Sequence, residues 1–160
     1  MQKELIIEKL SGENFDEFVK LIEIFANFEK LAPPDDKAKL RLREDGLGKN
    51  LKYEAYLGKI GDEYISYIIF FMAYSSFSAL PTLFLEDIFV LKGYRRLGIG
   101  QKMLNFCIEF AKERNCVRVD LTVLNWNTNA MKFYEKNNFK PLNWKIYRLE
   151  REHITNYSSD

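Results

Sequence analysis

The sequence predicts an α/β or α+β fold built around a mixed sheet, and three observations support this. Strand-like and helical segments follow one another in the order β-α-α-β-β-β-α-β-α-β. The three consecutive central strands, rich in aromatic and β-branched residues, are typical of an antiparallel meander. The 160 residues are 47% hydrophobic and 29% charged, which suits a buried core. Because no repeat or flexible linker interrupts the chain, we expect residues 1–160 to form one domain.

The first elements are a strand and an amphipathic helix. Leu5-Ile6-Ile7 is strand-like, and Asn14 followed three residues later by Glu17 is a capping-box signature for a helix start. Apolar residues then recur at three- and four-residue spacing, as on the buried face of a helix. This helix should end between Phe28 and Leu31, before a proline-containing loop.

A second, charged and weakly amphipathic helix is expected over Asp36 to Glu44. Asp45-Gly46-Leu47-Gly48 should close it, because both glycines permit positive φ. The remaining chain predicts three strands with one hairpin turn, then a helix, a strand, a helix and a closing strand. In order, these are Tyr53 to Leu57, the turn Gly58 to Asp62, Tyr64 to Tyr74, Leu83 to Val90, the helix from Gly98, Val117 to Val123, Asn127 to Asn137, and Trp144 to Leu149.

The charge balance argues against several classes of protein. Lys and Arg total 24 against 23 Asp and Glu, a net charge of +1, whereas a dedicated nucleic-acid binder is strongly basic. The start Met1–Glu4 leads into no apolar signal core. The longest apolar run, Tyr64 to Ala73, is shorter than the roughly 20 residues of a membrane helix. We expect a soluble cytoplasmic protein that binds neither nucleic acid nor a membrane.

Cysteine and histidine are scarce. Cys107 and Cys116 are the only cysteines and His153 is the only histidine, so we expect no metal site. Both cysteines are interpreted as packing thiols and His153 as a solvated side chain. Ser/His/Asp and Cys/His enzymes are disfavoured, because their base would have to be this one late residue.

The most informative segment is a strand that passes through a basic, glycine-containing turn into a helix, between Val90 and Lys102. Glycines let the backbone approach a ligand, and the N–H groups of a helix start favour an anion such as phosphate. A dinucleotide fingerprint would need glycine where Met103 stands. A P-loop would need Lys-Ser/Thr after Gly98, where Ile99 stands. The plain alternative is a turn with solvated arginines.

The pattern Arg95-x-x-Gly98-x-Gly100 resembles the Arg/Gln-x-x-Gly-x-Gly/Ala motif of the GCN5-related N-acetyltransferase (GNAT) superfamily. Further segments are similar to the branch that acetylates spermidine, spermine, other diamines and thialysine. These segments are Leu85 to Val90, Tyr94 to Gly100, Trp126-Asn127 and Phe133-Tyr134. The resemblance implies a mostly antiparallel sheet, flanked by helices and splayed where acetyl-CoA binds. It also implies a homodimer.

The resemblance implies that acetyl-CoA is the donor. It places the pyrophosphate on backbone N–H groups between Arg96 and Gln101, and the pantetheine arm along the backbone of Ile88 to Val90. A strand edge opened by a bulge can pair with an extended chain of amides as though it were another strand, which agrees with this assignment. The implied cofactor-binding residues are Ile88, Phe89, Val90, Arg95, Arg96, Leu97, Gly98, Ile99, Gly100, Gln101, Asn127, Thr128, Asn129, Ala130 and Tyr134. Asn127 is also a good helix N-cap.

Two residues are the catalytic candidates, Tyr134 and Glu86. The family's tyrosine matches Tyr134, whose phenol could donate a proton to the departing CoA sulfur; a core tyrosine is the plain alternative. Glu86 aligns with a glutamate that binds the substrate amine, and a carboxylate can accept the ammonium proton directly or through water. Alternation should send Glu86 and Asp87 to opposite faces of their strand, with Asp87 at a dimer-related site. An exposed edge-strand acid is the other interpretation.

Phe28 and Glu29 match a polyamine-contacting segment that is commonly Tyr-Glu in the family, so a hydroxyl is missing here. Glu29 could pair with a distal ammonium or with Lys30. Asn137-Asn138 stands where relatives have glycine, and asparagine also tolerates a left-handed helix end. We expect acetyl transfer to a primary amine of a small cationic substrate, bound by Phe28, Glu29, Glu86 and Asp87. A protein N-terminal or lysine acetyltransferase and a non-catalytic CoA-binding module are the alternatives.

Overall fold

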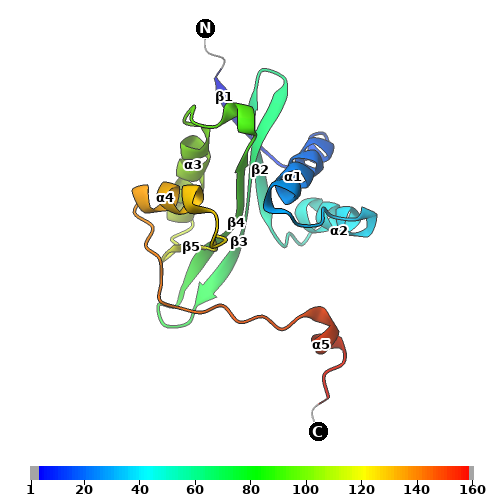
Figure 1. Ribbon diagram of the computed structural model, residues 1–160, viewed down its shortest axis with the longest axis vertical. Helices are drawn as coiled ribbons and strands as arrows, with labels where there is room; N and C mark the ends of the chain where they lie inside the picture. Colours follow the sequence, from blue (N-terminus) through cyan, green and yellow to red (C-terminus); the bar gives the residue numbers. More distant parts are fainter. Residues whose placement is uncertain (1–3, 159–160) are drawn as a thin grey trace. The chain divides into compact units, whose positions relative to one another are not determined.

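The computed structural model describes residues 4–158 and divides the chain into two compact units, residues 1–122 and residues 123–160 (Figure 1). The first unit contains the sheet and three long helices. The second unit contains the helices α4 (Thr128–Lys136) and α5 (Arg151–Thr155). Residues 1–3, which are part of the start Met1–Glu4, lie outside the described residues.

The sheet of the first unit has five strands in sequence order, β1-β2-β3-β4-β5. The first three pairings are antiparallel and the last, between β4 and β5, is parallel. This is the mixed, mostly antiparallel sheet that was predicted. The bounds are β1 (Leu5–Lys9), β2 (Glu54–Ile60), β3 (Glu63–Ser75), β4 (Leu80–Val90) and β5 (Val119–Leu121).

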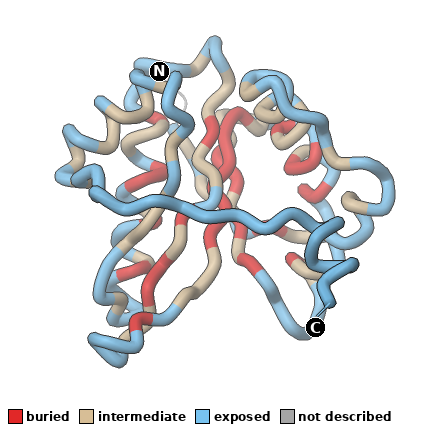
Figure 2. Tube along the Cα trace, turned by 60° about the horizontal axis from the view of Figure 1, so that its bottom comes forward, coloured by how far each residue is buried: buried red, intermediate tan, exposed pale blue. Residues whose placement is uncertain are grey.

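Helices cover both faces of this sheet (Figure 1). On one face lie α1 (Phe15–Glu29) and α2 (Asp36–Leu47), and on the other lies α3 (Ile99–Glu113). The ring of Phe18 on α1 lies 5.4 Å from that of Tyr67, and the ring of Phe110 on α3 lies 4.8 Å from that of Phe70. Tyr67 and Phe70 are three apart on β3 and therefore point to opposite faces. Buried residues accordingly concentrate on the strands and on the helix faces against them (Figure 2).

The start of α1 differs from the predicted capping box. The Asn14 side chain makes no cap hydrogen bond to the helix. Its Oδ1 instead accepts from the Ser11 N–H at 2.8 Å, and its Nδ2 donates to the Lys9 carbonyl at 3.1 Å. Asn14 therefore ties the end of β1 to the helix that follows. The predicted helix end is confirmed, since α1 ends at Glu29 and Lys30 takes a left-handed conformation.

The second helix is longer than predicted, and its glycines do not act as proposed. It continues through Gly46 to Leu47, and Gly48 has a φ of −74°, so neither glycine needs positive φ. Close packing explains Gly46 instead. A Cβ there would lie 2.4 Å from the hydroxyl oxygen of Tyr53, which donates to the Leu42 carbonyl at 2.6 Å.

Other strand boundaries also shift. Strand β2 continues to Ile60, so the turn is confined to Gly61 and Asp62, and Gly61 has a φ of 63°. The predicted strand from Val117 to Val123 is confirmed only for Val119–Leu121. Both differences follow from backbone pairing, which extends or ends a strand independently of its side-chain pattern.

In the second unit, α4 confirms the predicted helix. The Asn127 Oδ1 accepts from the Ala130 N–H at 3.2 Å, and Asn138 has a φ of 66° after the helix. The predicted closing strand over Trp144 to Leu149 is wrong. The described part of this unit contains no strand, and these residues are exposed. An alternating pattern forms a strand only where a neighbouring strand supplies hydrogen bonds.

Candidate active site

A β-bulge interrupts β4 at the predicted acidic pair. On the neighbouring strand β3, Ile69 pairs with Asp87. The next residue of β3, Phe70, pairs with Leu85, which leaves Glu86 as an extra residue on β4. A bulge of this kind bends the strand and re-aims the side chains beside it. Glu86 is exposed at this point.

The bulge changes which face of the sheet β4 side chains occupy. Residues directly opposite one another in an antiparallel pair share a face. Leu85, opposite Phe70, therefore faces α3, while Asp87, opposite Ile69, faces the core cluster that contains α1. In a regular strand, Leu85 and Asp87 would share a face. The extra residue therefore interrupts the simple alternation of β4 at Glu86, and the face that Glu86 takes opposite Asp87 stays a prediction.

Beyond the bulge, one edge of β4 is open in the sense that no strand of the described residues pairs with it. Pairing with β5 covers only Leu83 to Leu85. The Leu91 N–H donates to the Ile65 carbonyl of β3 at 2.8 Å, so Ile88 and Val90 direct their backbone groups away from β3. The backbone groups of Phe89 point the opposite way, toward β3, with which Phe89 pairs. Strand β4 thus separates from β5 beyond Leu85, as predicted, and the place of the pantetheine arm along Ile88 and Val90 stays a prediction.

Two further carboxylates, those of Glu29 and Glu86, lie near enough to Asp87 to act on its charge. Burial raises the pKa of Asp87 to about 6, the neighbouring charges of Glu86 and Glu29 act in the same direction, and the hydrogen bond from Tyr67 opposes them. Burial also raises the pKa of Glu29, at the last position of α1. These residues form the acidic group, which consists of Glu29, Glu86 and Asp87. Its excess of negative charge suits a cationic ligand.

Aromatic rings border the acidic group. The ring of Phe28, 40% exposed, stacks on that of Phe25 with centres 6.4 Å apart. The guanidinium of Arg95 lies over the rings of Phe28 and Phe89, at 4.7 and 5.7 Å from their centres. Its Nε donates to the Val90 carbonyl at 2.9 Å. Arg95 therefore links the glycine turn, residues Arg95 to Gly100, to the end of α1. The predicted residues Phe28 and Glu29 lie beside the strand as expected.

The glycine turn has the backbone shape of an anion-binding site. Arg96 and Gly98 are both left-handed, with φ of 64° and 78°, and Gly98 is the N-cap of α3 without a side-chain cap bond. The first helical bond runs from the Lys102 N–H to the Gly98 carbonyl, so the N–H groups of Ile99 and Gly100 precede it. No atom lies within 4 Å of a Cβ placed on Gly98. These residues fit a pyrophosphate.

The second unit carries the remaining predicted residues. Asn127 caps α4, and Thr128, Asn129 and Ala130 form its first turn. The half-buried ring of Tyr134 lies 5.4 Å from that of Phe133 and 5.6 Å from that of Phe139. Tyr134 is thus held within its own helix end by two aromatic neighbours.

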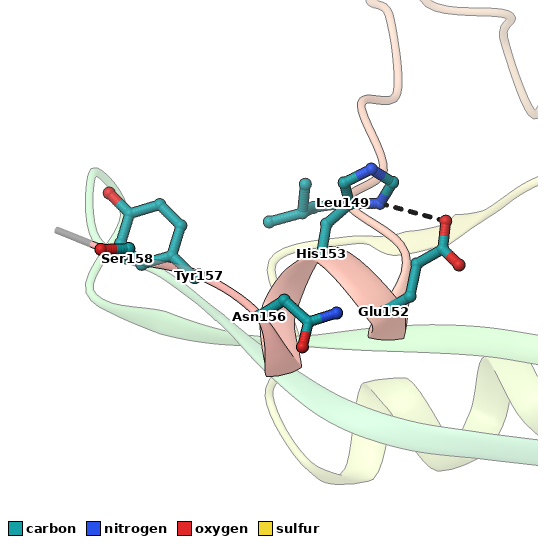
Figure 3. A pocket seen from close by; sticks show the side chains of 6 residues that line it. All are labelled: Leu149, Glu152, His153, Asn156, Tyr157 and Ser158. Atoms are coloured by element: carbon teal, nitrogen blue, oxygen red, sulfur yellow. Dashed lines mark ion pairs between the residues drawn. The ribbon is translucent and has the colours of Figure 1, made fainter. Parts of the chain in front are cut away.

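A hollow at α5 does not coincide with any predicted site residue (Figure 3). It contains the pair of His153 and Glu152, whose Nδ1 and Oε1 lie 3.6 Å apart. The side chains that line it belong to Leu149, Glu152, His153, Asn156, Tyr157 and Ser158. It therefore contributes nothing to the candidate site.

The thiols behave as packing residues. Cys107 is fully buried, and burial raises the pKa of its thiol to about 12, so it stays protonated. Among residues 4–158, no three His, Cys, Asp or Glu side chains are grouped closely enough to hold a metal ion. Within the same residues, no helix combines the length and apolar character needed to cross a bilayer.

Two solved acetyltransferase structures share this fold. A probable acetyltransferase superposes with a TM-score of 0.79 at 22% identity, covering 91% of this chain and 97% of the other. An aminoglycoside N-acetyltransferase in complex with CoA gives a TM-score of 0.76 at 17% identity, covering 92% and 95%. The likeness to these two structures shows the shared fold.

The chain belongs to the acetyltransferase (GNAT) family, whose model matches residues 18–139. It is 30% identical over 146 residues to the thialysine N-epsilon-acetyltransferase of Bos taurus, covering 84% of this chain and 85% of that protein. It is 34% identical over 93 residues to an L-ornithine N5-acetyltransferase of Arabidopsis thaliana, covering 57% of this chain and 41% of that protein.

One residue that contacts the acidic group was not predicted from the sequence. Tyr67 lies on β3, is fully buried, and donates a hydrogen bond to the Asp87 carboxylate. Its place in an apolar run favours a core interpretation, which is correct for the ring but omits the hydroxyl. Recognising it would have required the β3–β4 register, which the bulge alters.

Proposed function

We propose that this N-acetyltransferase acts on a primary amine of a small cationic molecule, of the polyamine, diamine or thialysine class. The observation that carries this proposal is the acidic group beside the open edge of β4. Carboxylates attract an ammonium ion, and aromatic rings next to them favour the aliphatic chain that carries it. The relatives named for thialysine and ornithine support an amine on a small molecule.

The acceptor must lose a proton before it can react. A primary ammonium has a reference pKa near 10.4, so it is protonated at neutral pH. In the proposal, Glu86 accepts this proton directly or through water. Its exposure at the bulge is compatible with contact with a substrate that arrives from solvent. The free amine then attacks directly in a ternary complex, without an acetyl-enzyme.

Tyr134 is proposed as the acid that protonates the leaving sulfur, and residues 1–160 are proposed to act as one domain. The match of the family model to residues 18–139, across the boundary at Thr122, supports a single functional domain. Acetyl-CoA supplies the acetyl group. Ile88 and Val90 offer backbone groups for its pantetheine arm, and the turn from Arg96 to Gln101 offers N–H groups for its pyrophosphate.

The absent hydroxyl at Phe28 bears on which amine is preferred. Where a tyrosine would offer a hydrogen bond, Phe28 offers only its ring face, over which Arg95 lies. Glu29 is then the polar group of this segment that can pair with a distal ammonium. The dimer and the cytoplasmic location expected from the sequence stay predictions.

The direct test is release of free CoA from acetyl-CoA between about pH 7 and pH 9, with spermidine, spermine, putrescine, thialysine, ornithine, lysine and short peptides. Saturable release with a small di- or polyamine, or a diamino acid, is expected. Turnover of peptides alone would contradict the proposed substrate class. Binding of acetyl-CoA without turnover of any amine would contradict the proposed reaction.

A paired substitution tests the role of Glu86. Glu86→Gln should lower kcat/KM for the amine by about 10²-fold or more, because the proton acceptor is lost, and should leave the KM for acetyl-CoA unchanged. Glu109→Gln, an exposed position on α3, is the matched control. Equal activity of the two variants would remove Glu86 from the mechanism.

A further inference from the structure

Tyr67 is a buried tyrosine whose hydroxyl meets the acidic group. Its side chain is completely shielded from solvent. Three rings surround it, with centres 5.4 Å away for Phe18, 6.3 Å for Phe25 and 6.0 Å for Phe89. Its hydroxyl donates to the Asp87 Oδ2 at 3.2 Å. The ring is therefore locked by packing, and the hydroxyl has a fixed direction.

The hydrogen bond from Tyr67 restricts the position of the Asp87 carboxylate. A hydroxyl in an aromatic environment requires a partner, since burying it unpaired is costly. The bulge at Glu86 provides that partner by turning Asp87 toward the α1 face. The Tyr67 hydroxyl occupies one carboxylate oxygen and leaves Asp87 a second oxygen with which to accept from a ligand.

The groups that act on Asp87 come from three elements. Glu29 belongs to α1, Glu86 to β4 and Tyr67 to β3. The two carboxylates disfavour a further negative charge at Asp87, and the Tyr67 hydroxyl favours it. A cation relieves this repulsion, and an ammonium group also brings N–H donors from which the carboxylate can accept.

We propose that Tyr67 is a positioning residue for the acceptor: its buried hydroxyl holds the Asp87 carboxylate in place to receive an ammonium group of the substrate. This inference rests on the proposed function, because it assigns Asp87 to the same acceptor site. The ionised form of Asp87 binds the ammonium, so its protonation weakens acceptor binding. Tyr67, by donating to the ionised form, extends acceptor binding to lower pH.

The test is the pH dependence of kcat/KM for the acceptor amine in Tyr67→Phe. The ring stays, so the aromatic packing is retained, but the hydrogen bond to the carboxylate is lost. The acidic limb should move to higher pH by about one pH unit, since a hydrogen bond to a charged group has that effect. The KM for the amine should rise several-fold below neutral pH, while the KM for acetyl-CoA stays the same.

The matched control is Tyr53→Phe. Tyr53 lies in the same core, its ring stacks on that of Phe18, and its hydroxyl also makes a buried hydrogen bond, but to the Leu42 carbonyl. This variant should lose stability without moving the acidic limb. In an Asp87→Asn background, Tyr67→Phe should have no further effect on the limb, because the group it acts on is absent.

The outcomes separate the two proposals. If the wild type acetylates no small amine, the proposed function fails and this inference fails with it. If the wild type is active but Tyr67→Phe keeps the wild-type acidic limb, the inference alone is overturned. It is equally overturned if Tyr53→Phe moves the limb as far as Tyr67→Phe does. A direct titration of the Asp87 carboxyl by carbon NMR should show the same upward displacement in Tyr67→Phe.

Discussion

The Nε of Arg95 donates to the carbonyl oxygen of Val90 at 2.9 Å, five residues earlier in the chain. This bond joins the glycine turn to the open edge of β4, and the guanidinium continues over the ring of Phe28 at the end of α1. One side chain thus connects the three segments that resemble the family's cofactor and acceptor sites. The connection holds the turn in place before any ligand is bound.

Arg95→Ala should lower the free energy of unfolding by about 1–2 kcal/mol, because it removes one hydrogen bond and the cation–π contacts. Urea unfolding monitored by circular dichroism measures this loss. Arg41→Ala, at an exposed position of α2, should change stability by less than about 0.5 kcal/mol. Equal effects of the two substitutions would show that the Arg95 contacts contribute nothing.

Arg96 separates backbone conformation from side-chain chemistry. Its φ of 64° lies in the left-handed region, which costs a non-glycine residue about 1–2 kcal/mol. Arg96→Gly should therefore be about 1 kcal/mol more stable to urea than Arg96→Ala. Both should bind acetyl-CoA about tenfold more weakly by calorimetry, since both lose the guanidinium. Unchanged affinity in both would mean that backbone groups alone hold the anion.

Tyr134→Phe should lower kcat by about 10²-fold or more, because the ring remains but the proposed proton donor is lost. The rings of Phe133 and Phe139 still have their partner, so the fold of α4 should be unaffected. Steady-state kinetics and acetyl-CoA titration provide the measurement, with no change in affinity expected. Tyr147→Phe, at a position 88% exposed, is the control. Full activity in Tyr134→Phe would refute its role as the acid.

Asp87→Asn should stabilise the protein at pH 7. The pKa of Asp87 is raised to about 6 in the folded state, against about 3.9 unfolded, so the folded protein binds this proton more tightly. Below about pH 4 both states are protonated, and as the pH rises through 6 the wild type bears the cost of the buried charge. The variant should gain about 1–3 kcal/mol at pH 7 and little at pH 4.

Urea unfolding at the two pH values measures this difference. The amide introduced by Asp87→Asn keeps an oxygen for the Tyr67 hydroxyl, so the hydrogen bond itself is not the variable. Asp62→Asn, in the exposed turn between β2 and β3, should show no such pH-dependent gain. A gain for Asp87→Asn of the same size at both pH values would contradict the assigned ionisation.

Patterns that depend on local sequence were predicted well. The amphipathic helices over Phe15–Glu29 and Ile99–Glu113 follow from apolar spacing alone. The meander of three antiparallel strands follows from β-branched and aromatic runs separated by a turn. The glycine turn was located because Gly98 has the backbone freedom that a tight strand-to-helix connection needs.

The positions of features that depend on strand pairing were not predicted. The bulge at Glu86 is a property of the β3–β4 register, and nothing in the residues of β4 alone reveals it. Tyr67 was missed for the same reason, since it meets Asp87 only across the two strands. The strand predicted over Trp144 to Leu149 failed because an apolar alternation specifies a face but not a partner.

Strand β4 is one residue longer than its pairing with β3 requires, and that residue is Glu86. A deletion of Glu86 would leave an unbroken ladder, in which Leu85 still lies opposite Phe70 and Asp87 still lies opposite Ile69. Asp87 and Phe89 would then keep their faces, because their partners on β3 are unchanged, and only the exposed carboxylate of Glu86 would be lost. The extra residue thus adds one carboxylate to the acidic group, while the core residues of β4 keep the faces that a regular strand without it would give them.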